Sequence, residues 1–395
     1  MTEAPIEVIE RCCTRGRAAV LDELERIVCR LGAPDSELYR HMLDYPLRPA
    51  KALRPTLCVN AARALGATEE AVLTSAATLE LLHNAFLIHD DIEDESLLRR
   101  GRPTLQRELG LSVAVNVADG MFALALRALL LNTETLGLGP SLEVLLTVGE
   151  MLQRTVEGQD LELGWIASNL VRFDDGEYRR RYERMVELKT AIYSFVTPVD
   201  VAAIAAEASP AVRSRLADYG RHVGVAFQIT DDLLNLDADE AVYGKESDGD
   251  LWEGKRTLVL LHALHHASEA DAARASSVLA AARPAASAPS ARRAELRELL
   301  VALHSDGHLD DVGRERLEAA LAVDAQVRAV KTDDDVSFLR GLVREHRSME
   351  YARDVALDHG RRATAALAEL RGDLAAGEAL DFLRALPAHV IERLR

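Results

Sequence analysis

The chain of 395 residues is 48% hydrophobic and 28% charged, a balance that is ordinary for a folded globular protein with a sizeable apolar core. Its formal net charge of −17 argues against nucleic acid or an anionic membrane surface as the main partner, because either would select a broad basic surface. An anionic substrate would therefore need local cations or metal ions in order to bind.

Helical periodicity dominates the chain. Strand patterns are scarce, whereas Ala, Leu, Glu and Arg recur at three- and four-residue spacing, which predicts an all-α protein. In chain order we expect helices at 5–31, 36–44, 52–65, 69–94, 112–131, 141–163, 175–206, 210–235, 255–267, 292–304, 311–330, 335–372 and 376–394. Residues 283–291 read RPAASAPSA, which offers little to bury and predicts a linker or surface excursion.

The four cysteines, at positions 12, 13, 29 and 58, form no C-x-x-C pair and have no histidine at zinc-site spacing, so we expect buried, reduced thiols. The N-terminus lacks the basic-then-apolar pattern of a signal peptide, and no apolar run reaches the roughly 18 residues that a membrane span needs. These observations favour a cytoplasmic protein without a membrane span.

Two predicted helices each end in a pair of aspartates. In the first, Asp90 and Asp94 share a helix face with Asp91 beside them, although like charges at that spacing repel one another. The second helix carries Asp231 and Asp232 near its end. If the two helices face each other, their carboxylates can bracket hard cations such as Mg²⁺. Either cluster alone would also fit a solvated acidic surface.

Isolated cations surround these clusters in the sequence. Each would singly fit an ordinary surface charge, but together with two acidic clusters they suggest a pocket for two phosphate-bearing substrates, because metal ions, Arg forks and Lys charges hold diphosphates well. They are Lys51, Arg54, Arg99, Arg100, Lys189, Lys245 and Lys255.

The acidic and basic motifs, in their order along the chain, resemble those of the trans-isoprenyl diphosphate synthases, also called polyprenyl synthetases. The resemblance covers roughly residues 45–265 and, more weakly, the stretch from 347 to 352. It rests on a linked set: E-L-L-H at 80–83, D-D-x-x-D at 90–94 with the trailing RRGRPT, Gly158-Gln159, Lys189-Thr190, F-Q-x-x-D-D at 227–232 and G-K-R-T at 254–257. A lone D-D-x-x-D would be weak evidence, but an ordered set is specific.

The resemblance implies an isoprenoid synthase-type bundle of long helices around a central apolar cavity, in a single domain over residues 1–395 with a surface insertion at about 284–331. It also implies a transferase that condenses isopentenyl diphosphate with an allylic diphosphate to give a trans-polyprenyl diphosphate. Three Mg²⁺ ions per active site and a homodimer are further implications.

Residue roles follow from the same resemblance, position by position. The metal ligands would be Asp90, Asp91, Asp94, Asp231 and Asp232. The allylic diphosphate would be held by Arg99, Lys189 and Lys255, with Lys245 and Gln228 also binding substrate. Isopentenyl diphosphate would be bound by Lys51, Arg54, His83 and Arg100. Oxygens near Lys189, Thr190 and Gln228 would steady an allylic carbocation.

Product length is expected to depend on the turn below the first acidic motif. Phe86 lies four residues before Asp90, so its ring should project toward the growing chain, while Ala85 beside it offers no barrier. In the family, aromatic residues at these two positions set the cavity floor. One aromatic residue implies an intermediate product, C20 geranylgeranyl diphosphate first and C15 farnesyl diphosphate next. Phe86 could also serve simply as core.

Three departures from the family pattern affect these expectations. Asn235 stands where a third aspartate is expected, Pro49-Ala50 replace paired glycines before Lys51, and residues 284–331 exceed the usual length. The alternatives are a class I terpene cyclase, which needs no second diphosphate site, a non-catalytic partner subunit of a prenyl synthase, and a helical scaffold. Intact Asp90, Asp91 and Asp94 and the second set of cations favour the transferase.

Overall fold

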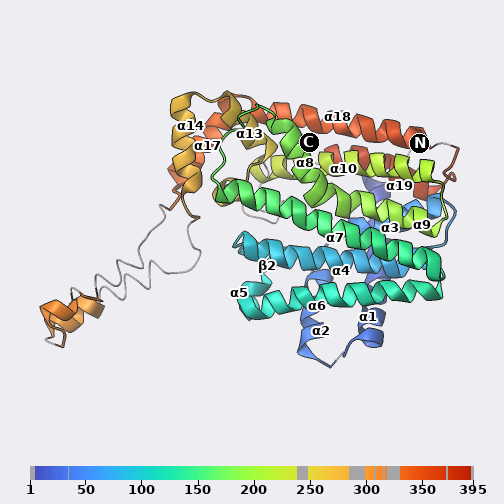
Figure 1. The fold of residues 1–395 in the computed structure, drawn as a ribbon, viewed down its shortest axis with the longest axis horizontal. Helices are drawn as coiled ribbons and strands as arrows, with labels where there is room; N and C mark the ends of the chain where they lie inside the picture. Colours follow the sequence, from blue (N-terminus) through green and yellow to red (C-terminus); the bar gives the residue numbers. More distant parts are fainter. Residues whose placement is uncertain are drawn as a thin grey trace.

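The computed structural model of the protein describes residues 5–33, 35–237, 248–283, 299–306, 308–314, 316–317, 330–370 and 372–392. Helices dominate these residues, so the expected all-α class is confirmed (Figure 1). The first half contains α1 Pro5–Leu31, α2 Glu37–Leu47, α3 Leu53–Ala64, α4 Glu69–Glu93, α5 Leu105–Leu109, α6 Leu111–Leu129, the 3₁₀ helix η1 Leu130–Glu134 and α7 Leu138–Ala167. A two-residue hairpin, β1 Leu98–Arg99 with β2 Arg102–Pro103, separates α4 from α5.

The second half departs more from the predicted boundaries. It contains α8 Tyr178–Val186, the π-helix η2 Glu187–Val196, α9 Thr197–Ala205, α10 Pro210–Asp237, α12 Gly249–Glu253, α13 Leu258–His266, α14 Glu269–Ala280, α17 Asp333–Glu345, α18 Ser348–Ala368 and α19 Glu378–Glu392. The helix expected at 175–206 is thus divided by a π-helical stretch. The helix expected at 335–372 breaks before α18, where Arg347 has φ 51°.

Two apolar clusters form the core, and α10 contributes to both. Val223 and Ala226 belong to the cluster built with α1, α3, α4 and α6, while Val225 and Ile229 belong to the cluster built with α13, α17 and the first half of α18. The last described helix, α19, closes the first cluster by packing on α1 and α3. Phe382 is fully buried there. Helix α10 therefore links the two clusters, and it lies beside α18 (Figure 1).

Three helical segments are long and apolar enough to cross a membrane by length and composition alone: Glu69–Glu93, Leu111–Glu134 and Tyr178–Ala205. The expectation that no segment reaches this threshold is wrong, because a window that admits one or two charges still qualifies. Inside the protein, 72%, 44% and 67% of their apolar windows are buried, so the first and third mainly supply core. The middle one leaves a large part of its apolar surface exposed.

All four cysteines are free thiols, as expected. Cys12, Cys13 and Cys58 are buried, and burial raises the pKa of Cys13 to about 11 and that of Cys58 to about 12. Cys29 is exposed, which corrects the expectation that every thiol is buried.

The two described ends of the predicted surface excursion between α14 and α17 meet at one place. Ala282 and Val330 form a parallel bridge, and the Lys331 amide donates to the Ala282 carbonyl over 2.9 Å. The described residues 299–306 and 308–314 lie away from the body of the molecule (Figure 1). The parts of the predicted helices 292–304 and 311–330 that fall at 292–298 and 318–329 lie outside the described residues.

Candidate active site

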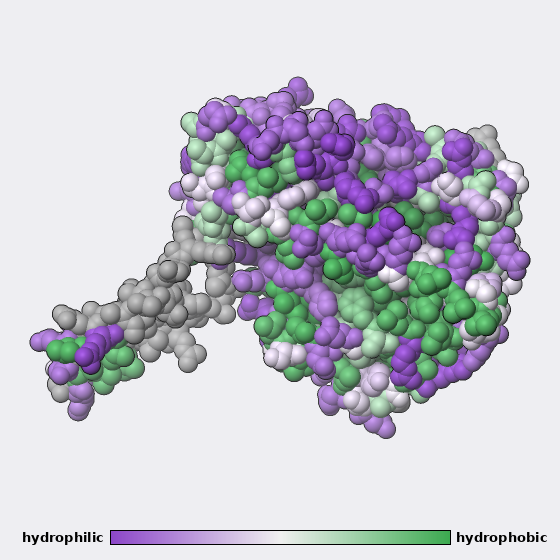
Figure 2. Space-filling model, viewed as in Figure 1, coloured by the Kyte–Doolittle hydropathy of each residue, from purple (hydrophilic) through white to green (hydrophobic). Residues whose placement is uncertain are grey.

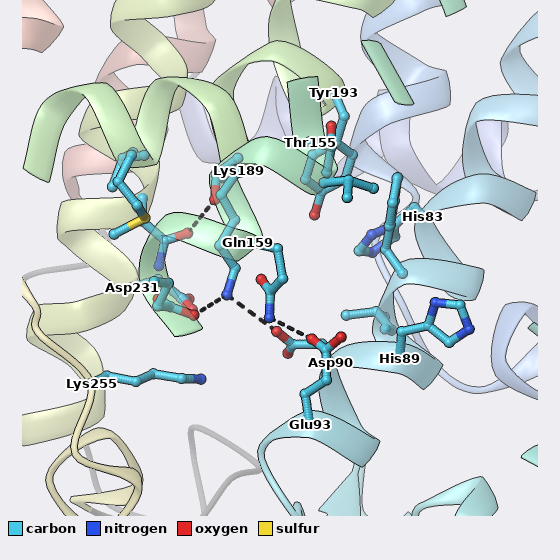
Figure 3. Close-up of a pocket in the computed structure, with 18 of the residues that line it drawn as sticks. His83, His89, Asp90, Glu93, Thr155, Gln159, Lys189, Tyr193, Asp231 and Lys255 are labelled. Atoms are coloured by element: carbon cyan, nitrogen blue, oxygen red, sulfur yellow. Dashed lines mark hydrogen bonds and ion pairs between the residues drawn. The ribbon is translucent and has the colours of Figure 1, made fainter. Parts of the chain in front are cut away.

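A cavity of about 1260 Å³ lies among α4, α7, η2 and α10, and the loop before α13 closes one side of it (Figure 3). Most of the predicted site residues line this cavity, although they come from helices far apart in the sequence. They are Arg54, His83, Phe86, Asp90, Arg99, Arg100, Lys189, Thr190, Gln228, Asp231, Asp232 and Lys255. The fold therefore brings the two acidic motifs and the cations together.

The remaining predicted site residues lie elsewhere. Lys51 is exposed, just before Ala52, which has φ 49°. Ala85 and Asp91 are fully buried, and the Asp94 side chain, 5% exposed, turns toward Lys255. Lys245 lies outside the described residues.

Lys189 connects the acidic end of α4 to α7. Its ammonium donates to Asp90 Oδ1 over 3.3 Å and forms a shorter contact with Glu162 (Figure 3). Burial alone would lower the pKa of Lys189, but these two carboxylates raise it above its ordinary value. The π-helix that carries Lys189 comes so close to α7 that a Cβ at Gly158 would clash with the Lys189 backbone. Gly158 thus permits this approach.

Lys255 makes a similar contact from the opposite side. Its ammonium lies 2.5 Å from Asp94 Oδ2 and 3.0 Å from Glu253 Oε2. Burial raises the pKa of Asp94 to about 7 despite the neighbouring ammonium. Asp90 of α4 and Asp94, directly after it, therefore each contact an ammonium group.

The carboxylates at the cavity suit a divalent cation whose remaining coordination positions are filled by a bound substrate or water. Among the described residues, no group of three or more His, Cys, Asp or Glu side chains converges tightly enough to hold a metal ion alone. Asp90 and Asp231 nevertheless face the cavity from opposite walls (Figure 3). Mg²⁺ prefers one or two carboxylates together with phosphate oxygens and water, so these oxygen donors fit it. The ammonium groups of Lys189 and Lys255 lie against these carboxylates, which shows where positive charge is stabilised.

The second aspartate of each pair is held by a tyrosine. Asp91 accepts from Tyr45 over 2.7 Å and is also held by the Arg99 guanidinium, whose Nε lies 2.9 Å from Oδ1. Asp232 accepts from Tyr182 over 2.6 Å, and burial raises its pKa to about 7. Asp90 and Asp231, the first aspartates, line the cavity; of the second aspartates, Asp232 lines it as well, whereas Asp91 does not.

A second cationic group lies where α3 meets α4 and η2. Arg54 donates to His83 Nε2 over 3.2 Å and to Tyr193 over 2.9 Å. Because an arginine has only donors, Nε2 must accept, which places the His83 proton on Nδ1. Burial and the neighbouring arginines lower the pKa of His83 well below its usual range, so it is neutral. Its Nδ1 atom has no hydrogen-bond partner within the described part of the chain.

An aromatic group lines the apolar side of the cavity. The Phe86 ring packs edge-to-face on Phe122 of α6, with centroids 5.2 Å apart, and lies 5.4 Å from Tyr193 of η2. Phe86 therefore lines the cavity one turn from Asp90, as its spacing predicted, and is also packed against other rings.

Gln228 and Thr190 are linked within the cavity wall. The Thr190 hydroxyl donates to Gln228 Oε1 over 2.9 Å, and Gln228 Nε2 donates to Asp232 over 2.8 Å. Asn235, the departure in the second motif, lies one turn further and is buried. Its Oδ1 accepts from the Asp250 amide over 3.0 Å, so the carboxamide holds the start of α12 and does not line the cavity.

Several site residues were missed by sequence reasoning. Glu162 had a usable signal, because it follows Gln159 by three residues and so shares a helix face with it. Tyr45, Tyr182, Phe122 and Tyr193 had none, since their roles depend on contacts between helices.

The family described as polyprenyl synthetase matches residues 36–294. The octaprenyl diphosphate synthase of Escherichia coli (strain K12) is 38% identical over 217 residues, 55% of this chain and 62% of that protein. The geranylgeranyl diphosphate synthase of Methanosarcina mazei is 33% identical over 239 residues, 60% of this chain and 70% of that protein. The crystal structure of a polyprenyl synthase from Caulobacter crescentus CB15, complexed with calcium and isoprenyl diphosphate, has TM-score 0.70 and 25% identity, covering 99% of this chain and 98% of that one.

Proposed function

Because the chain belongs to the polyprenyl synthetase family, we propose that it condenses isopentenyl diphosphate with an allylic diphosphate to give a trans-polyprenyl diphosphate. The bundle around an apolar cavity is shared with a solved relative, so the expected isoprenoid synthase-type fold is confirmed. One observation carries the functional proposal: Asp90 and Asp231 face one cavity from separate helices, with Lys189 and Lys255 beside them. An acidic protein can bind a diphosphate at such a site.

The chain's own groups would bind the allylic diphosphate at the acidic end. Asp90, Asp94 and Asp231 would hold Mg²⁺, and the resemblance gives three ions as the expected number. Mg²⁺, when bound, supplies positive charge that stabilises a departing diphosphate. Lys189 and Lys255 would exchange their carboxylate partners for phosphate oxygens. Arg99 keeps its hydrogen bonds to Asp91, so it can donate to the diphosphate only through the N–H groups that do not bind Asp91.

Isopentenyl diphosphate would bind beside Arg54, Arg100 and His83. Neutral His83 accepts from Arg54 through Nε2 and so orients its guanidinium, while the arginines supply the charge for the phosphate oxygens. Thr190 and Gln228 would present oxygen atoms to the allylic carbocation, and the aromatic wall would exclude water that could quench it.

A direct test is incubation with Mg²⁺, labelled isopentenyl diphosphate and C5, C10 or C15 allylic primers, followed by measurement of product length. We expect elongation with at least one primer. Absence of elongation with all three would refute the proposal.

For product length we propose C20, with C15 as the second candidate. The matched relatives are named for products of different length, octaprenyl and geranylgeranyl diphosphate. The product length of this chain is therefore inferred from the residues that line its own cavity. Phe86→Ala removes the ring next to the cavity and opens a space beside Phe122, so the main product should lengthen by at least one C5 unit. Chromatography of the products measures this. Phe173→Ala, outside the cavity lining, is the control and should leave the product length unchanged. If the product lengths are unchanged in both variants, Phe86 does not form the floor of the cavity.

We also propose a homodimer that covers the exposed apolar face of α6 and α7. Figure 2 shows apolar side chains gathered over these helices. Leu111 is 59% exposed, Leu138 is 67% exposed and Leu146 is 73% exposed, which is unusual for leucines on neighbouring helices. Such a contiguous face is best explained by a second copy of the chain.

Leu146→Glu should weaken the dimer by about 10²-fold or more, because it would bury an unpaired carboxylate at the interface. Analytical ultracentrifugation would report the shift to monomer. Ile6→Glu is a matched control on α1, where the parent residue is 45% exposed outside this face. A parent protein that is monomeric at micromolar concentration would contradict the homodimer.

A further inference from the structure

The two ends of the predicted excursion between α14 and α17 meet the last turn of α12, just before the loop that carries Lys255. Arg283, at the outgoing end, donates through Nη1 to Glu253 Oε1 over 2.9 Å. Lys331, at the returning end, donates through Nζ to the Trp252 carbonyl over 2.6 Å. Both contacts fall within the three residues that precede Lys255.

These contacts are enclosed. Lys331 is only 3% exposed, and the side chains of Arg283 and Glu253 are 12% and 13% exposed. Solvent therefore screens the pair between Arg283 and Glu253 less than it would a surface ion pair. Gly254 has φ +75° and lies against Lys331, because a Cβ there would come within 3.2 Å of its Nζ atom. The backbone of the loop thus depends on a glycine and on the returning end of the excursion.

Glu253 is shared between the excursion and the cavity. Its Oε1 atom accepts from Arg283, while its Oε2 atom lies 3.0 Å from the Lys255 ammonium, which in turn contacts Asp94. A continuous chain of alternating charges therefore leads from the base of the excursion to the first acidic motif. Arg283 offsets the charge of Glu253, and Lys255 is left more available to a phosphate.

The geometry points to Arg283 and Lys331 as positioning residues that hold the end of α12 and the loop after it so that Lys255 can bind the allylic diphosphate. Lys331 lies beyond residues 36–294, where the family matches, so the match itself gives this residue no role. The inference rests on the proposed function for the identity of the ligand. It assigns to the base of the excursion a task in substrate binding.

Arg283→Gln should raise the KM for the allylic diphosphate about tenfold, because an uncompensated Glu253 would compete with the phosphate for Lys255. The KM for isopentenyl diphosphate should stay within about twofold, since that site uses Arg54 and Arg100. Arg283→Lys retains the charge and should restore most of the affinity. Lys331→Met removes the hydrogen bond to the Trp252 carbonyl and so loosens the end of α12. It should raise the KM for the allylic diphosphate about threefold.

A double-mutant cycle separates positioning from a general structural effect. If Arg283 acts through Glu253, Arg283→Gln should have no further effect in a Glu253→Gln background. An equal effect in both backgrounds, or a parallel rise of both KM values, would overturn the inference. Arg213→Gln is a control that breaks another partly buried arginine pair, with Asp200 and Glu143, outside the cavity lining.

Titration calorimetry with inorganic diphosphate and Mg²⁺ provides a readout that needs no turnover. We expect Arg283→Gln to weaken diphosphate binding about tenfold and Arg213→Gln to leave it unchanged. If the parent elongates no primer but shows this pattern, the proposed function fails while the positioning role stands. If the parent elongates primers and Arg283→Gln changes neither KM nor calorimetric affinity, the positioning role alone is refuted.

Discussion

Asp90→Ala is expected to lower turnover by about 10³-fold or more, because several kcal/mol of charge stabilisation depend on a cation held at this carboxylate. The fold should survive, since Lys189 keeps Glu162 as a partner and the repulsion among the carboxylates of α4 falls. Steady-state elongation assays and thermal unfolding measure the two effects. We expect the unfolding temperature to change by no more than about 3 °C.

Asp22→Ala on α1 is the matched control, because it removes an exposed carboxylate outside the cavity lining. A second readout uses Mg²⁺ with inorganic diphosphate, which should raise the unfolding temperature of the parent and of Asp22→Ala but not of Asp90→Ala. Activity retained within tenfold in Asp90→Ala would show that Asp90 is not a metal ligand.

Arg99→Met should destabilise the protein by about 3–5 kcal/mol, because it leaves the carboxylate of Asp91 buried without its charged partner. Asp91 is fully buried, and Tyr45 alone would then hold it. Urea unfolding measures the loss. Arg102→Met on the same hairpin is the control: its side chain is 50% exposed, and surface ion pairs contribute about 0–1 kcal/mol.

The loss of unfolding free energy in Arg99→Met should become larger as pH rises. Burial raises the pKa of Asp91, and Arg99 is the strongest influence that lowers it, so the substitution raises the folded-state pKa further. Below the unfolded value of about 3.9, Asp91 is protonated in both states and the charge penalty disappears. The loss of stability should therefore grow as pH rises from the folded-state pKa of Asp91 in the parent, itself raised, through the still higher pKa in the variant. A deficit independent of pH, or a variant as stable as the parent, would contradict this account.

The sequence predicted the helices and the position of the acidic motifs well, because both depend on local periodicity. Asp90 faces the cavity and Phe86 lies one turn away, as i and i+4 spacing requires. The different surroundings of Asp90 and Asp91 could not be predicted. They depend on Tyr45, a residue 46 positions away that reaches Asp91 only through the packing of α2 on α4.

The π-helix η2 also lay beyond sequence reasoning. Hydrophobic periodicity of about 3.6 residues identifies a helix over the whole stretch but does not reveal a local change of pitch. Nor does Gly158 alone predict the close approach of η2, since helical glycines occur for many reasons. The roles of Arg283 and Lys331 were hidden for a further reason: each acts through a contact with a loop distant in sequence.

The position of α19 has a consequence for how the chain is made. Its buried residues, such as Phe382 and Leu386, cover α1 and α3, which are synthesised some three hundred residues earlier. During translation the apolar faces of the first helices therefore stay uncovered until residues 378–392 have left the ribosome. Nascent chains with such surfaces are prone to aggregate and are typical clients of chaperones. Ribosomes that stall before α19 would release a chain whose first apolar cluster cannot close.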